Sequence, residues 1–378
     1  MVLHVFNNES AFLDLGITSY TNAKIASHFA VFGKEESPKF LNDGQDVEYH
    51  QIGSDSYQQF LSAVESKGYK LIIFHGLLAN NIQVATDLLK LGIQGIKTGW
   101  IIYGAEIPNA KLKIDHFHGP KTRKLYYRLK PIRYILPIVK AFEFLRKYNT
   151  KSIIKKMDYF VHFMPEEIEW VEGQMSVKKQ HLWSIYIMLE DYIGPELYDR
   201  SVSNQKNIMI GNSSSFTSNH VELIDALKGR IPSGFKVHVP LNYGNKGYGS
   251  YIKNYGTTQL GSQFVPMMDR LPRDEYNEFL LSCPFVFMNH FRQQALGNIL
   301  TALWMGAKIY LNEDISTYVY LKRLGFHIFS ITKFFESEKL ELEILGKAEV
   351  EHNRELMMQH FSRESVSAKM HESFKQFS

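Results

Sequence analysis

The chain has 378 residues, 44% of them hydrophobic and 22% charged, so it is globular and long enough for two domains. Its only cysteine, Cys283, excludes an internal disulfide and a cysteine-based metal cluster and predicts a reducing compartment. The net charge is +4. No apolar run approaches the roughly 18 residues of a membrane-spanning helix. The N-terminal residues 1–6 predict a buried strand and not a signal peptide.

The first half of the chain alternates strands and helices. Strands are predicted at 2–6, 28–32, 70–74, 99–103 and 158–163, and helices at 56–67, 81–91 and 165–180. His75 and Gly76 follow one predicted strand directly, and the Gly104-Ala105-Glu106 turn follows another after Tyr103. Ligands bind at the carboxyl ends of strands in open α/β sheets, so these residues are candidates for a site.

A strongly basic segment at 121–157 interrupts this pattern. Its twelve Lys or Arg residues are opposed by one acid, Glu143, and are interleaved with aromatic and aliphatic side chains at helical spacing. This composition suits an anionic membrane surface. Nucleic acid is a competing partner, and a helical pair with a buried apolar face and solvated cations is the alternative without a ligand. We favour the membrane and predict no nucleic acid. The predicted membrane-facing cations are Lys121, Arg123, Lys124, Arg128, Lys130 and Arg133.

A polar stretch at 201–205 marks a linker, and strands and helices alternate again after it. Strands are predicted at 207–211, 235–239, 284–288, 307–311 and 326–329, and helices at 219–228, 246–256, 272–282, 292–305 and 315–324. We therefore expect domains at 1–200, carrying the basic helical insert 121–157, and at 205–345, followed by one long closing helix at 346–378. The predicted fold class is α/β, with two Rossmann-like domains facing a central cleft.

Two loops in the second half are typical of a diphosphate site. Residues 285–288 form an apolar strand that ends in a polar turn, and a helix is predicted to begin near Gln293. The N–H groups and dipole of a helix N-terminus favour an anion, and Arg292 adds a cation with bidentate geometry. The loop Gly211-Asn212-Ser213-Ser214 repeats the design. Ordinary turn chemistry and a surface salt bridge are the alternative explanations.

Several common motifs are absent from the sequence. It has no Asp-x-Asp pair, no Gly-x-Gly-x-x-Gly after the first strand and no Walker loop, which argues against a metal–diphosphate clamp, a nicotinamide dinucleotide fold and an ATPase. Diphosphate binding by backbone amides, hydroxyls and cations remains, without a metal or other cofactor.

At these motifs the chain resembles glycosyltransferase family 56. The matching segments are Phe74-His-Gly76, Trp100 to Glu106, Ile210-Gly-Asn-Ser213 with Ser218-Asn-His220, Val237-His-Val-Pro240, and Phe291-Arg-Gln-Gln294 with Gly297. Members of this family transfer an N-acetylfucosamine-type sugar from a dTDP-sugar to a polyprenyl-diphosphate-linked saccharide. The family usually has Asp where this chain has Glu106, and often Trp where it has Tyr103.

The resemblance implies a GT-B fold, inversion at the anomeric carbon, no metal, and peripheral attachment to the cytoplasmic face of the bacterial inner membrane. Glu106 is our first candidate for the general base and His75 the second, with Tyr103 and Gly76 on the acceptor side. The predicted donor site consists of Gly211, Asn212, Ser213, Ser214, Arg292, Gln293, Gln294 and Gly297.

Two other functions remain open from the sequence. A sugar-nucleotide epimerase could share the GT-B architecture and use a buried acid without an acceptor site. A non-catalytic nucleotide-binding protein would bind the donor without consuming it. The basic segment favours the transferase, because a soluble epimerase needs no lipid contact.

Overall fold

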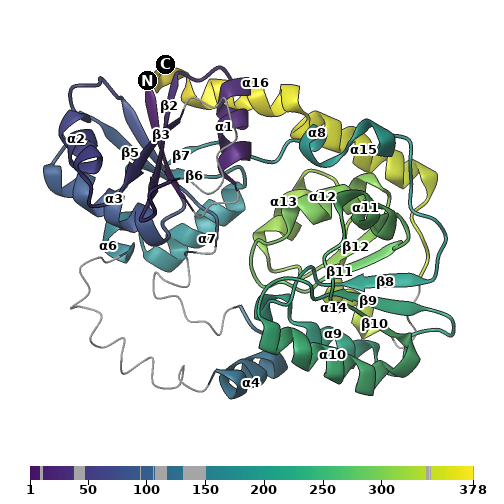
Figure 1. The fold of residues 1–378 in the computed structure, drawn as a ribbon. Helices are drawn as coiled ribbons and strands as arrows, with labels where there is room; N and C mark the ends of the chain where they lie inside the picture. Colours follow the sequence, from purple (N-terminus) through teal and green to yellow (C-terminus); the bar gives the residue numbers. More distant parts are fainter. Residues whose placement is uncertain are drawn as a thin grey trace. The chain divides into compact units, whose positions relative to one another are not determined.

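The computed structural model describes residues 1–8, 12–37, 47–93, 95–104, 106, 117–130, 150–337, 340 and 342–377. They form two compact α/β units (Figure 1). The first unit comprises Met1–Leu112, Phe142–Met188 and Phe361–Ser378, and the second comprises Lys113–Ala141 and Leu189–His360. The expected boundary near residue 200 therefore falls at residue 188, and the start of the basic segment belongs to the second unit.

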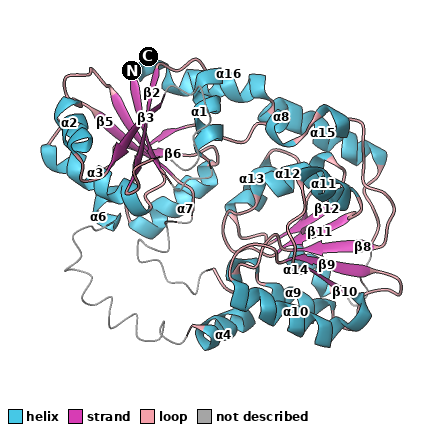
Figure 2. Cartoon of the chain, viewed as in Figure 1, coloured by secondary structure: helices cyan, strands magenta, loops and turns pink. Residues whose placement is uncertain are grey.

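The first unit is built on a seven-stranded parallel sheet with the order β3-β2-β1-β4-β5-β6-β7. The order reverses between β1 and β4, and both of these strands are buried on all residues, as a sheet covered on both faces requires. Helices cover the sheet (Figure 2). The strands are β1 Val2–Asn7, β2 Ser27–Gly33, β3 Val47–Gln51, β4 Leu71–His75, β5 Lys97–Ile101, β6 Tyr159–Val161 and β7 Gln180–Leu182.

Helices α2, α3 and α7 of the first unit were predicted and α1 was not, and the prediction also differs from the structure near residue 175. There α7 ends at Met175 because Ser176 takes the left-handed conformation (φ 52°), and the chain continues to β7, where helix was expected. The helices are α1 Leu13–Asn22, α2 Asp55–Ala63, α3 Ala79–Leu91, α6 Thr150–Lys156, α7 Pro165–Met175 and α16 Arg363–Phe374, with a 3-10 turn at Lys375–Phe377.

The second unit has a six-stranded parallel sheet with the order β10-β9-β8-β11-β12-β13, which reverses between β8 and β11. The edge strand β10 escaped prediction because it contains Pro266, and proline is tolerated in a sheet mainly at edges. The strands are β8 Asn207–Ile210, β9 Lys236–Pro240, β10 Phe264–Met267, β11 Phe285–Met288, β12 Lys308–Leu311 and β13 Phe329–Ser330.

Nine α-helices are described in the second unit, together with 3-10 turns at Pro195–Leu197, Phe216–Ser218 and Gly261–Gln263. The α-helices are α4 Pro120–Leu129, α8 Leu189–Tyr192, α9 His220–Leu227, α10 Lys246–Leu260, α11 Arg273–Leu281, α12 Leu296–Trp304, α13 Ser316–Arg323, α14 Ile331–Glu336 and α15 Lys347–Phe361.

The prediction of one long closing helix is wrong. The tail forms two helices, α15 and α16, because Ser362 between them has an extended conformation (φ −62°, ψ 150°) and its side chain accepts a hydrogen bond from the N–H of Ser365. This is an ordinary N-cap, which begins a new helix. Val366, Met370 and Phe374 of α16 are buried in the first unit.

Four of the six cations that were predicted to face a membrane lie in α4 and Lys130 follows it directly, but the apolar face of the helix is not available for lipid. Leu125 and Tyr126 are buried in the core of the second unit beside residues of β8, α9 and α10. Lys121 forms an ion pair with Asp225 of α9. Arg128 stacks 5.0 Å from the Tyr251 ring centroid. The segment therefore begins as a core-packed helix, whereas Arg133 and the rest of 131–149 lie outside the described residues.

Glu222 of α9 caps α4 from a neighbouring helix. Its Oε1 accepts hydrogen bonds from the backbone N–H groups of Lys121 and Thr122, both at 2.9 Å, and Oε2 accepts from the Thr122 hydroxyl. These donors at the first turn of α4 have no partner within the helix.

We expect Glu222→Ala to lower the free energy of unfolding by about 2 to 3 kcal/mol, because it leaves several polar groups without a charged acceptor. Urea denaturation measures the effect. Glu222→Gln keeps a carbonyl oxygen for the two N–H groups and should lose less than half as much. An unchanged unfolding midpoint for Glu222→Ala would contradict the capping role.

Candidate active site

The first candidate group lies at the carboxyl ends of β4 and β5. Gly76 (φ 73°) turns the chain after β4, and Gly104 (φ 80°) turns it after Tyr103. The Tyr103 ring packs directly on Gly76, because a Cβ at that position would lie 2.6 Å from Tyr103 Cδ2. The ring of Phe12 lies 5.3 Å from that of Tyr103. The structure thus brings together the predicted acceptor-side residues of two strands.

Glu106 is held rigidly in this group. It is fully buried, and its Oε1 accepts hydrogen bonds from Trp100 Nε1 and from the backbone N–H of Tyr103, both at 2.9 Å. Trp100 is itself buried in β5. A carboxylate fixed by two donors keeps its position without help from a ligand. The bond from the Tyr103 N–H also anchors the loop after β5.

His75 belongs to a buried chain of hydrogen bonds. Tyr186 Oη lies 2.5 Å from His75 Nδ1, His75 Nε2 lies 2.9 Å from His4 Nδ1, and His4 Nε2 lies 3.1 Å from Ser27 Oγ. The Ser27 hydroxyl donates to the carbonyl of Ile25 at 2.9 Å.

The donation by Ser27 fixes the direction of the whole chain. Ser27 Oγ must accept from His4 Nε2–H, so His4 Nδ1 accepts from His75 Nε2–H. His75 Nδ1 then accepts from the Tyr186 hydroxyl. Burial and the nearby charge of His4 hold the pKa of His75 well below 6.5, so the ring is neutral. Both ring nitrogens of His75 therefore have protein partners.

Tyr186, His4 and Tyr20 were not predicted as part of this group. Tyr20 donates or accepts a 2.9 Å hydrogen bond with Ser184, and its ring packs near those of His4 and His75. Burial, and then the neighbouring Tyr103 and Tyr20, raise the pKa of Tyr186 well above 10. The partners are separated by up to 164 positions along the chain, so no local pattern could reveal them.

The second candidate group lies at the point where the order of the second sheet reverses. Gly211 follows β8, and Asn289 and His290 follow β11. Gly211 has φ 67°, and a Cβ there would lie 2.3 Å from His220 Nε2, so only glycine fits. Ligands of open α/β sheets bind at such a reversal.

Asn212 connects three segments in this group. Its Nδ2 donates to Tyr243 Oη at 2.8 Å, and its Oδ1 accepts from Gln294 Nε2 at 3.1 Å. His290 Nε2 lies 3.1 Å from the same Oδ1 and must be the donor. Gln294 is held in turn by the Thr217 hydroxyl, which donates to its Oε1 at 2.6 Å. Predicted residues of both loops therefore meet at Asn212.

The two serines have mainly local roles. Ser214 donates through its hydroxyl and its N–H to the carbonyl of Tyr243, at 2.6 and 2.8 Å. The carbonyl of Ser213 accepts from the Ser218 hydroxyl at 3.3 Å. Asn219, which was not assigned a role, donates to the carbonyl of Asn289 at 2.8 Å and so joins the loops after β8 and β11.

Helix α12 begins later than predicted. Its first residue is Leu296, after Ala295 in the left-handed conformation (φ 59°), so Arg292, Gln293 and Gln294 lie in the preceding loop. Arg292 is half-buried, and its Nη1 donates to the carbonyl of Gln293 at 3.0 Å. Gly297 does not face this group: a Cβ there would lie 2.4 Å from Tyr192 Cε1, so it makes room for that ring.

Two buried histidines complete the second group. His220 and His290 are fully buried, and burial lowers the pKa of each to about 3, so both are neutral. Within the described part of the chain, His220 Nε2 and His290 Nδ1 have no hydrogen-bond partner. The position of His290, close behind the buried strand β11, was the sequence signal that could have identified it as a site residue.

Metal ligands do not gather in the described ranges: no group of three or more His, Cys, Asp or Glu side chains could hold an ion. The same residues include no helix with the length and apolarity needed to cross a bilayer.

Solved structures that match this chain include a glycosyltransferase, a sucrose-phosphate synthase and a galactosyltransferase. A glycosyltransferase from Rickettsia africae ESF-5 matches with a TM-score of 0.61 and 11% identity over 100% of this chain and 98% of that one. Sucrose-phosphate synthase from Thermosynechococcus elongatus matches with a TM-score of 0.59 and 10% identity, over 99% of this chain and 98% of that one. The lipopolysaccharide outer core galactosyltransferase WaaB matches with a TM-score of 0.58 and 9% identity, over 100% of this chain and 99% of that one.

The fold is therefore GT-B, as predicted. The chain belongs to glycosyltransferase group 56, since the family model described as 4-alpha-L-fucosyltransferase glycosyl transferase group 56 matches residues 11–349. This confirms the family resemblance drawn from the motifs.

Proposed function

We propose that this glycosyltransferase moves an N-acetylfucosamine-type sugar, a 4-acetamido-4,6-dideoxyhexose, from a dTDP-sugar to a polyprenyl-diphosphate-linked saccharide. The reaction would invert the anomeric carbon, need no metal, and take place at the cytoplasmic face of the bacterial inner membrane during assembly of a surface polysaccharide. Family membership supports the sugar and acceptor classes. The observation that carries the proposal is the convergence of both predicted donor loops on Asn212.

The donor diphosphate is assigned to the second unit. Gly211 lets the ring of His220 lie against the backbone after β8, and Arg292 in the neighbouring loop offers a guanidinium that matches a phosphate. The neutral rings of His220 and His290 can donate to or accept from an oxygen without adding charge. Such a site would stabilise the negative charge that develops on the leaving nucleotide.

We assign to Glu106 of the first unit the role of general base, which takes the proton of the acceptor hydroxyl. In an inverting transfer the acceptor oxygen forms a bond to the anomeric carbon while the bond from that carbon to the diphosphate oxygen breaks. The carboxylate takes the acceptor's proton in the same step. Trp100 and Tyr103 hold the carboxylate in place for this transfer.

We expect Arg292→Ala to weaken dTDP binding by about ten- to a hundredfold, because charge-assisted hydrogen bonds contribute about 1.5 to 3 kcal/mol. Isothermal titration calorimetry measures the affinity. Arg270→Ala is the matched control, since Arg270 is exposed and follows β10 of the same sheet. Equal affinity of wild type and Arg292→Ala would remove Arg292 from the donor site.

The function itself is tested by incubating the full chain with a panel of nucleotide sugars and a polyprenyl-diphosphate-linked acceptor, with and without a chelator. The proposal expects transfer from a dTDP-sugar that chelation does not reduce. Conversion of the donor to an epimer without an acceptor would favour an epimerase, and binding without turnover would favour a non-catalytic protein.

A further inference from the structure

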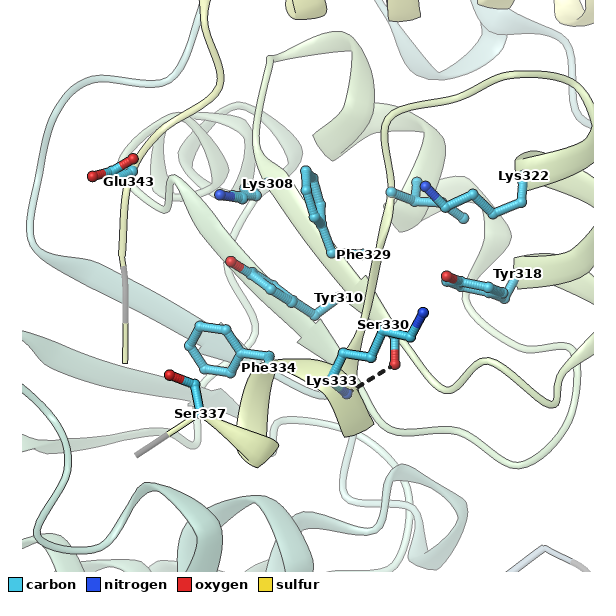
Figure 3. Close-up of a pocket in the computed structure, with 11 residues that line it drawn as sticks. Lys308, Tyr310, Tyr318, Lys322, Phe329, Ser330, Lys333, Phe334, Ser337 and Glu343 are labelled. Atoms are coloured by element: carbon cyan, nitrogen blue, oxygen red, sulfur yellow. Dashed lines mark hydrogen bonds between the residues drawn. The ribbon is translucent and has the colours of Figure 1, made fainter. Parts of the chain in front are cut away.

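A basic, aromatic pocket lies at the β13 edge of the second sheet, apart from the candidate active site. Its cavity of about 450 Å³ is bordered by residues of β12, α13, β13 and α14. Figure 3 shows the rings of Tyr310 and Phe329 between Lys308 on one side and Lys322 and Lys333 on the other. It shares no residue with the Asn212 group.

Three lysines converge on this pocket. Lys308 Nζ lies 4.7 Å and Lys322 Nζ 5.8 Å from the Phe329 ring centroid. Burial and the charge of Lys333 lower the pKa of Lys322. Among the described residues, none of the three ammonium groups forms an ion pair. Like charges held together repel one another, and a bound anion relieves that repulsion.

The acids near the pocket do not remove its positive charge. Glu343 is the one carboxylate among the residues that line it. Glu313 accepts a hydrogen bond from the hydroxyl of Ser330, which lines the pocket. The lining therefore carries three cations and one anion, which predicts a ligand with at least one negative group.

Exposed apolar side chains flank the cations. Val319 of α13 is 43% exposed and stands three positions before Lys322, so both lie on one face of the helix. Ile344 is also 43% exposed and follows Glu343. Cations beside exposed aliphatic side chains are typical of surfaces that meet lipid headgroups and the first acyl carbons.

We propose that this pocket binds the phosphate of an anionic phospholipid headgroup, with Val319 and Ile344 against the adjoining lipid. The inference deepens the proposed function, because it rests on the assignment of the enzyme to a membrane surface. It also places membrane contact elsewhere than on α4, whose apolar face is buried in the core.

The test is cosedimentation of the full chain with vesicles of phosphatidylcholine, with or without phosphatidylglycerol. Each cation near an anionic surface contributes about fivefold in binding, so Lys322→Gln/Lys333→Gln should bind the anionic vesicles about thirtyfold less tightly than wild type. Lys228→Gln/Lys253→Gln is the control, since both residues are exposed in the same unit and neither lines the pocket. The control should bind as wild type.

Val319→Ser tests whether the pocket binds a lipid or a soluble phosphate. The proposal expects Val319→Ser to lose vesicle binding. It expects Lys322→Gln/Lys333→Gln and Lys228→Gln/Lys253→Gln to transfer sugar to a water-soluble acceptor analogue at the wild-type rate. Vesicle binding of Lys322→Gln/Lys333→Gln equal to that of wild type overturns the proposal, as does binding of glycerol phosphate at this pocket without binding of vesicles. Failure of the wild type to transfer any sugar would instead count against the proposed function.

Discussion

Glu106→Gln is expected to lower turnover by at least about a hundredfold and to leave dTDP affinity unchanged. The glutamine carbonyl oxygen can still accept the hydrogen bonds from Trp100 Nε1 and from the N–H of Tyr103, so the loop after β5 keeps its anchor. What the substitution removes is the ability to take a proton. Steady-state rates with saturating donor and acceptor, together with calorimetry for dTDP, measure the two effects.

A similarly buried carboxylate provides the control. Glu172 of α7 is buried, and its Oε1 accepts from the backbone N–H of Lys179 at 2.8 Å. Glu172→Gln therefore makes the same chemical change away from the strand ends and should retain most of the turnover. If Glu106→Gln also retained it, Glu106 would only anchor its loop, and the base would have to be sought elsewhere.

Acidification is expected to destabilise both units steeply. Burial lowers the pKa of His4, His220 and His290 to about 3, that of His162 to about 4 and that of His75 well below 6.5. The unfolded chain binds more protons than the folded chain between these values and pH 6.5. Stability is therefore fully present above 6.5 and is lost as the pH falls, by about 1.4 kcal/mol per pH unit for each histidine.

Urea denaturation followed by circular dichroism between about pH 7 and about pH 4 measures this slope. His162→Asn should reduce this slope by about one proton, because it removes one titrating ring from the first unit. Asparagine is chosen because its oxygen can still accept the 3.1 Å hydrogen bond from the N–H of Met164. A flat stability profile over this range would contradict the buried neutral rings.

The central strands were predictable because they are mostly apolar. β1, β4 and β11 are buried on every residue, and each appears in the sequence as a short hydrophobic run. The edge strands β3 and β10 are largely half-buried and were missed, as was the exposed start of β7. The polar residues of β3 and β7 make these strands resemble loops, since only hydrogen bonding to a neighbouring strand defines them. The proline of β10 argued against a strand there.

The candidate site was predictable at strand ends and less so in its details. The positions of Gly211 and Asn212 followed from strand, turn and helix signals. The start of α12 did not, because nothing in the sequence marks Ala295 for a left-handed conformation. Nor could the sequence reveal that His75 contacts His4 and Tyr186, since these contacts depend on the order of the strands.

The split tail has a practical consequence for engineering. The first unit includes α16 from the far end of the chain, and Met1 donates a 3.0 Å hydrogen bond from its amino group to the carbonyl of Phe377. A chimera that exchanges sugar-recognition halves between related enzymes by a single crossover near residue 188 would pair one parent's sheet with the other's α16. Such hybrids need a second crossover near Ser362, so that the gene segment for 363–377 travels with its own N-terminal half.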